Sequence, residues 1–88
     1  MYFAYVLKSS KDGELYIGST NDLKRRLLEH NQKKVPSTKN RAPLKLVYYE
    51  AYCAEDDARR REQALKLRGQ ARQHLMKRIS ASLLQNKS

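Results

Sequence analysis

The chain has 88 residues, about the length of one domain, and 40% of them are hydrophobic, so we expect a single domain over 1–88 with a small core. No apolar run approaches the ~18 residues of a membrane span, and no basic region precedes the first apolar stretch as in a secretory signal. We therefore expect a cytoplasmic protein. The single cysteine, Cys53, excludes an internal disulfide and a cysteine-rich zinc site, and we expect it to be a half-buried small apolar residue.

The basic residues fall into two blocks that favour a nucleic acid as partner. The net charge is +10, from 19 Lys and Arg against 9 Asp and Glu. Eight bases and one acid lie between Lys24 and Lys45, and eight bases and one acid lie between Arg59 and Arg78. A membrane-surface helix would pair its bases with an apolar face bearing Trp or Phe, but the chain has no Trp and one Phe. A phosphate backbone is therefore a better partner than a membrane, and a merely basic protein is the alternative.

The first half of the chain predicts a β-hairpin followed by a helix. Tyr2–Leu7 and Leu15–Gly18 have the aromatic and β-branched composition of strands. The Asp-Gly pair within Ser9–Gly13 predicts the turn that joins them. N-cap residues and leucines at helical spacing predict a helix over about Asp22–His30.

The second half predicts a strand and two helices. Gln32–Pro43 holds both prolines and four bases, which indicates a mobile basic loop. Leu44–Tyr52 has strand composition, and an acidic first turn opens a helix over about Glu55–Leu67. A last helix is expected over about Gln70–Leu84, with fraying at Asn86–Ser88. The order ββαβαα predicts an α+β fold, a small three-stranded antiparallel sheet flanked by helices.

Tyr5 and Tyr16 lie one on each strand of the predicted hairpin. If the paired positions of the antiparallel strands have an odd sum, both phenols lie on the same face of the sheet. Two neighbouring phenols can hydrogen-bond an anion and exchange protons. The alternative is a pair of ordinary strand tyrosines that pack edge to face.

Arg26 and His30 are four residues apart and share one face of the first predicted helix. A guanidinium can hold phosphate oxygens in a bidentate contact, and the start of this helix just after Gly18 brings the face near the hairpin. The alternative is a solvated face on which Asp22 pairs with Arg26.

Glu62 lies on what should be a buried stripe of the second helix. Ala58, Arg61, Glu62 and Leu65 follow the i, i+3, i+4, i+7 spacing, yet two of the four are charged. Burying an unpaired carboxylate is costly. Glu62 therefore either pairs internally, with Arg61 or Arg26, or lines a cleft and binds a hard cation such as Mg²⁺.

Together these positions resemble the GIY-YIG endonuclease superfamily, and most of all its small stand-alone bacterial branch. Tyr16–Gly18 reads Tyr-Ile-Gly, and Phe3–Tyr5 stands at the first triplet, of which it keeps the tyrosine. Asp22–His30 resembles the family's first helix, and Ala58–Glu62 followed by Lys66 resembles the helix with its metal-binding glutamate. The resemblance spans residues 2 to about 80.

The resemblance implies a metal-dependent endonuclease that hydrolyses phosphodiester bonds in DNA with low intrinsic sequence specificity. Tyr5 or Tyr16 would be the general base, its pKa depressed by nearby cations. Arg26 would bind the scissile phosphate, and His30 would be a phosphate ligand or a proton relay. Glu62 would hold one Mg²⁺ or Mn²⁺, whose water protonates the leaving 3′ oxygen. The candidates for backbone contacts are Lys24, Arg25, Lys33, Lys34, Lys39 and Arg41.

Two departures and two rival functions accompany this interpretation. The first triplet lacks its glycine and isoleucine, and the downstream asparagine of many members has no clear counterpart, because Asn86 lies too close to the end. One rival is a nucleic-acid-binding module of the same fold without catalysis. The other is a structural or interaction protein. The expected partner is nucleic acid, with no membrane, and a homo-oligomer or a recruiting protein stays open.

Overall fold

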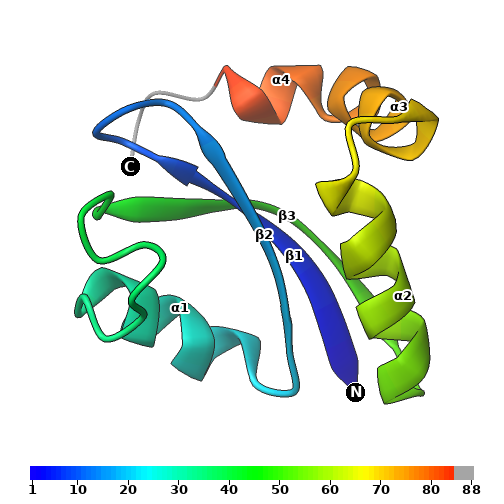
Figure 1. Ribbon diagram of the computed structural model, residues 1–88, viewed down its shortest axis with the longest axis horizontal. Helices are drawn as coiled ribbons and strands as arrows, with labels where there is room; N and C mark the ends of the chain where they lie inside the picture. The colour runs from blue at the N-terminus through cyan, green and yellow to red at the C-terminus, as the bar shows by residue number, and fades with distance from the viewer. Residues whose placement is uncertain (85–88) are drawn as a thin grey trace.

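The computed structural model describes residues 1–84 and has the predicted α+β architecture, a three-stranded antiparallel sheet with helices packed on it (Figure 1). β1 is the central strand, with β2 and β3 at its sides. No helix within residues 1–84 is long and apolar enough to cross a membrane. The elements are β1 (Tyr2–Ser9), β2 (Leu15–Thr20), α1 (Leu23–Asn31), β3 (Leu44–Tyr52), α2 (Glu55–Lys66), α3 (Gln70–Arg78) and α4 (Ser80–Leu83).

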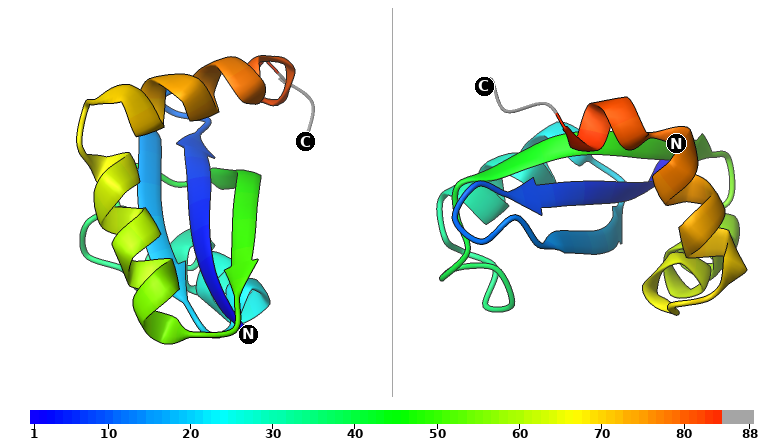
Figure 2. Two further views of the ribbon diagram at one scale, coloured as in Figure 1. Left: turned by 90° about the vertical axis from the view of Figure 1, so that its right-hand side faces the viewer. Right: turned by 90° about the horizontal axis from the view of Figure 1, so that it is seen from above.

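The two faces of the sheet carry two separate apolar clusters. Alternation along β1 sends Val6 to one face, where Ile17 and residues of α2 and α3 pack against it. It sends Tyr5 and Leu7 to the other face, where leucines of α1 cover them. Figure 2 shows α2 running beside the strands and continuing into α3 and α4. Because the two clusters lie on opposite faces, α1 and the α2–α3 pair are held on the sheet by separate sets of contacts. Each fully buried apolar side chain in them contributes roughly 1.5–3 kcal/mol to folding.

A bulge at Val47 decides which residues of β3 face which helix. Val6 pairs with Tyr48, whereas the next residue, Leu7, pairs with Leu46, which leaves Val47 as an extra residue. Before the bulge, Leu44 and Leu46 join the cluster under α1. After it, Tyr48 and Glu50 lie on the α2 face, where Glu50 meets an arginine described below, and Tyr49 between them lies on the α1 face.

The helix ends follow the predicted chemistry with one exception. Asp22 is the N-cap of α1, and its carboxylate accepts a hydrogen bond from the backbone N–H of Arg25 (3.1 Å). The single helix expected over 70–84 is wrong, because the backbone turns at Ile79 and divides it into α3 and α4. The turn lets Leu83 pack on the core while its carbonyl accepts a hydrogen bond from Lys8 Nζ (2.6 Å).

The segment from 32 to 43 is not the mobile loop that its composition suggests. Val35 and Thr38 are buried within it. The Asn31 side chain donates to the carbonyl of Leu44 (3.0 Å) and accepts from its N–H (2.7 Å), which closes the loop at its base. The buried hydroxyl of Ser9 donates to the carbonyl of Arg41 (2.6 Å). The loop is therefore packed against the hairpin by buried polar groups.

Two further expectations concern the connecting and terminal segments. Cys53 is exposed, and the half-buried position expected for it is wrong, because it lies beyond the end of β3 in the turn to α2. The expected fraying of Asn86–Ser88, and the question of Asn86 as a site residue, lie outside the described residues.

Candidate active site

The hairpin register brings the two candidate tyrosines to one face of the sheet. Tyr5 pairs with Gly18 and Leu7 pairs with Tyr16, so the paired positions have an odd sum and both phenols face α1. Their ring centroids are 6.4 Å apart. A Cβ on Gly18 would stand 2.5 Å from the hydroxyl oxygen of Tyr5 and 3.1 Å from the ring of Tyr16. The Tyr5 hydroxyl therefore lies directly over Gly18, in the space that a side chain at this position would fill.

His30 lies behind Tyr5 and is fully buried. Its Nε2 is 2.9 Å from the Tyr5 hydroxyl, and its Nδ1 is 2.7 Å from Thr38 Oγ1. Burial, together with the nearby Arg26 guanidinium, lowers the pKa of His30 to about 4. At neutral pH the imidazole is therefore uncharged, with one nitrogen able to accept a proton and the other able to donate one.

Arg26 stands where α1 approaches the two phenols. Its Nη1 donates to Glu29 Oε1 (3.1 Å), and its guanidinium also interacts with the Tyr5 hydroxyl. Burial raises the pKa of Tyr5 to about 12, although the Arg26 guanidinium opposes that shift. The expectation that cations depress the phenol pKa is wrong for Tyr5, because loss of solvation outweighs the adjacent positive charge.

Glu62 approaches the same stretch of β2 from α2, on the opposite face of the sheet. Ser19, the residue after Gly18, donates its hydroxyl proton to Glu62 Oε1 (2.6 Å). Lys66 Nζ lies 2.7 Å from the other carboxylate oxygen, one helical turn along α2. The Glu62 carboxylate adds to the rise in the pKa of Tyr5, so the two groups are within electrostatic reach across the Gly18–Ser19 backbone.

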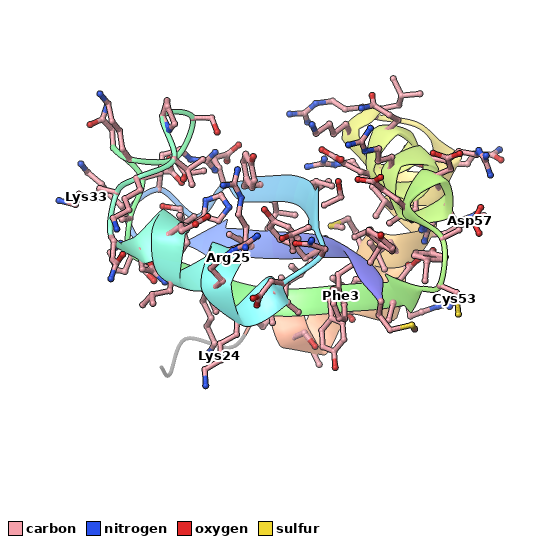
Figure 3. All side chains as sticks on the ribbon, turned by 90° about the horizontal axis from the view of Figure 1, so that it is seen from below. Phe3, Lys24, Arg25, Lys33, Cys53 and Asp57 are labelled. Atoms are coloured by element: carbon pink, nitrogen blue, oxygen red, sulfur yellow. The ribbon has the colours of Figure 1, made fainter. Side chains whose placement is uncertain are left out.

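A hollow opens between α1 and α2 at the end of β2 (Figure 3). Arg26 and Ser19 both line it, so it joins the guanidinium on α1 to the residue that holds Glu62. Its other walls carry hydroxyl, amide and guanidinium groups and one carboxylate, that of Glu55; the guanidinium groups suit an anion, and the polar lining disfavours an apolar ligand. The lining residues are Tyr2, Ser19, Thr20, Asn21, Arg25, Arg26, Glu55, Ala58 and Arg59.

Comparison with known proteins agrees with this arrangement. Residues 1–81 match the family model described as the GIY-YIG catalytic domain. The chain belongs to the GIY-YIG family. This family is one of nucleases. Tyr5 and Gly18, which are paired across β1 and β2, are the last residues of the segments at its two name-giving triplets.

GIY-YIG relatives include small bacterial proteins of similar size. A UPF0213 protein of Bacillus pumilus is 41% identical over 66 residues, which is 74% of this chain and 66% of that protein. One from Streptococcus agalactiae is 46% identical over 65 residues, 73% of each chain. The solution NMR structure of a UPF0213 protein from Bacillus halodurans is 30% identical, has a TM-score of 0.54, and is matched over 90% of this chain and 85% of its own.

Within this GIY-YIG domain, the sequence-predicted site residues form one group of four and one separate residue. Tyr5, Tyr16, Arg26 and His30 meet on the α1 face of the sheet. Glu62 reaches the same edge from the α2 face, and within residues 1–84 no hydrogen bond or ion pair joins it to those four. The internal pairing expected for Glu62 is wrong in its partners, because Ser19 and Lys66 hold the carboxylate.

The neighbouring arginines have carboxylates of their own, which explains why they do not pair with Glu62. Arg61 Nε lies 3.0 and 3.1 Å from the two oxygens of Glu50 on β3. Arg26 pairs with Glu29, and Asp22, the alternative partner on α1, instead caps that helix. The two charged residues of the α2 stripe therefore bind to different strands: Arg61 pairs with β3 and Glu62 bonds to β2.

The six predicted backbone contacts lie in different places. Arg25 lines the hollow, and Figure 3 labels it on α1. Lys24 points away from the sheet in the same view, and Lys33 lies at the loop end of the molecule. Arg41 pairs with Asp12 across the hairpin turn (3.3 Å). Lys34 and Lys39 are exposed on the packed loop. Their contact with a nucleic acid stays a prediction.

Three residues of the site escaped the sequence interpretation. The predicted second strand ends at Gly18, but β2 extends to Thr20, so Ser19 lies on the strand and faces α2 and Glu62. Thr38 lies in a segment with no periodic signal, and its contact with His30 spans eight residues of irregular chain. Arg59 was counted only in the general charge of its block. The alternation along β2 was the one signal that could have revealed Ser19.

Proposed function

We propose that this GIY-YIG domain is a metal-dependent endonuclease that hydrolyses phosphodiester bonds in DNA with low intrinsic sequence specificity. One observation carries the proposal: a guanidinium, two phenols and a carboxylate all border the Gly18–Ser19 stretch of β2. Hydrolysis needs a positioned water, charge stabilisation on the phosphate and help for the leaving oxygen, and these groups can supply all three.

Arg26 is the residue that we propose for the scissile phosphate. Its side chain is 35% exposed and borders the hollow, so a phosphate can reach it. Its present partner, Glu29, also lies 3.8 Å from Arg25 Nε, so one carboxylate is shared between two arginines and Arg26 has no acidic partner of its own. The positive charge stabilises the negative charge that grows on the phosphoryl oxygens in the transition state.

Tyr16 is the phenol that we propose as general base, with Tyr5 as its support. Tyr16 is half-buried, whereas Tyr5 is 2% exposed, has a pKa of about 12 and is hydrogen-bonded to His30. Water can therefore approach Tyr16 more easily. Acting as the phenolate, Tyr16 takes a proton from the attacking water as the water oxygen bonds to phosphorus and the bond from phosphorus to the 3′ oxygen breaks. His30 is too buried to touch the phosphate, and of its two expected roles the geometry favours the proton relay, through Tyr5.

Glu62 suits a single hard cation that is shared with substrate. Mg²⁺ commonly takes one or two protein carboxylates and completes its shell with water and phosphate oxygens. The Glu62 carboxylate is 14% exposed, with the Ser19 hydroxyl beside it, whereas its partner Lys66 is 46% exposed and free to swing away. When bound there, Mg²⁺ or Mn²⁺ would supply a water acidic enough to protonate the leaving 3′ oxygen.

Nicking of a supercoiled plasmid in Mg²⁺ or Mn²⁺ tests the proposal. We expect Glu62→Gln to lower the nicking rate by at least about 100-fold, in the range of losing one transition-state contact. Glu14→Gln, the same change on the exposed hairpin turn, should leave the rate unaltered. Retained activity in Glu62→Gln would remove the metal assignment. DNA binding without nicking in either metal would instead favour the non-catalytic binding module.

The choice between the phenols has its own test. Tyr16→Phe should abolish nicking, because it removes the hydroxyl that faces water. Tyr5→Phe should lower the rate more moderately and shift its pH dependence, since it breaks the contact with His30. The reverse order of severity would transfer the role of base to Tyr5.

A further inference from the structure

Two arginines from different helices line the hollow beside Arg26, outside the group of residues assigned to bond cleavage. Arg25 extends from α1, and Arg59 extends from the first turns of α2. We propose that this pair is a binding subsite for a second, uncut phosphate of the nucleic-acid backbone next to the scissile one. The inference rests on the proposed function and names how that site holds its substrate.

The two guanidiniums are accessible and already oriented. Arg25 Nη2 donates to Asn21 Oδ1 (3.2 Å), and Arg59 Nη2 lies 3.0 Å from Glu55 Oε2. Their side chains are 57% and 67% exposed, so neither is committed to the core. A guanidinium held in place loses less conformational freedom when it binds phosphate oxygens than a free one does.

The chemistry of the lining favours an anion of the size of a sugar-phosphate unit. Thr20 and Asn21 also line the hollow, and the Asn21 amide N–H groups can donate to phosphate oxygens, whereas the Ser19 hydroxyl is held by Glu62. The volume of the hollow is about 280 Å³, at the small end of ligand sites. It therefore accommodates one backbone unit, gripped from α1 and from α2.

Glu55 makes the subsite an exchange site. Its carboxylate lines the same hollow and pairs with Arg59 in the absence of substrate. A phosphate that binds Arg59 takes the place of this carboxylate, because both use the same guanidinium N–H groups. Removal of the Glu55 charge should therefore strengthen binding more than removal of the Asp57 charge, which raises the net charge equally but releases Arg60 instead.

The neighbouring Arg60 provides a matched control. It has the same charge and helix, is 76% exposed and pairs with Asp57 (3.2 Å), but it lines a different hollow on the far side of α2. Arg59→Gln and Arg60→Gln therefore change the net charge equally. Only the first removes a group from the proposed subsite.

Fluorescence anisotropy with a labelled DNA oligonucleotide tests the subsite, in a Glu62→Gln background so that no cleavage is needed. Arg59→Gln should weaken binding about eightfold at 0.1 M salt and reduce the slope of log K against log salt by about 0.9, the value for one lost phosphate contact. Arg60→Gln should change affinity by less than about twofold, and Glu55→Gln should tighten it. Circular dichroism should show the same fold for all three.

Equal weakening by Arg59→Gln and Arg60→Gln would overturn the subsite and leave only general electrostatic attraction. Tightening by Glu55→Gln that is no greater than that by Asp57→Asn would overturn the exchange. These outcomes do not depend on nicking, so a chain that binds through Arg59 but cuts no DNA would keep the subsite and lose the nuclease. A chain that nicks DNA but binds it equally well after Arg59→Gln would keep the nuclease and lose the subsite.

Discussion

The hydroxyl oxygen of Tyr5 lies 2.5 Å from the position that a Cβ on Gly18 would occupy, and the ring carbon that bears the hydroxyl lies 2.7 Å from it. The two residues are directly paired across β1 and β2, and Tyr5 is fully buried. The phenol therefore cannot yield to a methyl group without leaving His30. Tyrosine at position 5 can therefore take this orientation only if position 18 is glycine.

Gly18→Ala should destabilise the fold by about 1–3 kcal/mol, the usual cost of forcing an extra methyl group into a packed core. It should also depress nicking, because the Tyr5 hydroxyl must move. Chemical denaturation measures the first effect. Gly69→Ala is the control, since nothing lies within 4 Å of a Cβ there, and its loss should be clearly smaller. Equal losses at the two sites would contradict the steric argument.

Thr38→Val should reveal the role of the packed loop. The substitution keeps the shape but leaves His30 Nδ1 without its partner inside the core, at a cost of about 1–3 kcal/mol. It should also change the tautomer population of the imidazole, which ¹⁵N chemical shifts report directly. Thr38→Ser retains the hydroxyl and should restore the native tautomer. If Thr38→Val leaves both stability and tautomer unchanged, Thr38 does not position His30.

Stability should decline in mildly acidic solution because of His30. Its pKa falls from 6.5 to about 4 on folding, so between these values the unfolded chain binds the proton and the folded chain does not. The contribution is fully present above pH 6.5 and decreases by about 3 kcal/mol as the pH falls to 4. Between pH 6.5 and 4, the free energy of unfolding, measured by chemical denaturation, should depend less on pH in His30→Gln than in the unmodified protein. His74→Gln, at an exposed position, should show the same pH dependence as the unmodified protein.

Glu50→Gln should loosen α2 from the sheet. Glu50 accepts hydrogen bonds from Arg61 Nε, from the hydroxyl of Tyr48 (2.5 Å) and from that of Tyr52. Loss of the charge weakens all of these partly buried contacts, and we expect a loss of about 1–3 kcal/mol in the free energy of unfolding. Asp57→Asn, which breaks an ion pair with both partners more than half exposed, should cost under about 1 kcal/mol. Similar losses would show that the Glu50 cluster has no special stabilising role.

The sequence predicted the elements because their signals are local. Strand composition, the Asp-Gly turn, the Asp22 cap and the acidic start of α2 each involve a few adjacent residues. The common face of Tyr5 and Tyr16 depended in addition on the hairpin register, and the structure gives it the odd sum that brings them together. Local pattern was therefore enough for the architecture, whereas the meeting of the phenols needed the register.

The remainder depended on contacts between distant segments. Nothing near Thr38 indicates that it would be buried against His30, and nothing near Glu62 indicates Ser19 as a partner 43 residues away. The sign of the pKa shift at Tyr5 was also out of reach, because it depends on how completely the phenol loses water rather than on which charges lie nearby. These are properties of packing and not of spacing.

The extra residue at Val47 lets the two parts of β3 direct their even-numbered residues to different helices. The leading part supplies Leu44 and Leu46 to α1, and the trailing part supplies Glu50 to α2. Deleting that one residue would restore regular alternation and leave both parts in place, because Leu46 would still pair with Leu7 and Glu50 with Ala4. Straightening the bulge without a deletion would instead shift one part by one residue and turn its side chains to the other face. A homologue whose third strand is shorter by one residue at this point can therefore keep both the leucines under α1 and the Glu50–Arg61 pair.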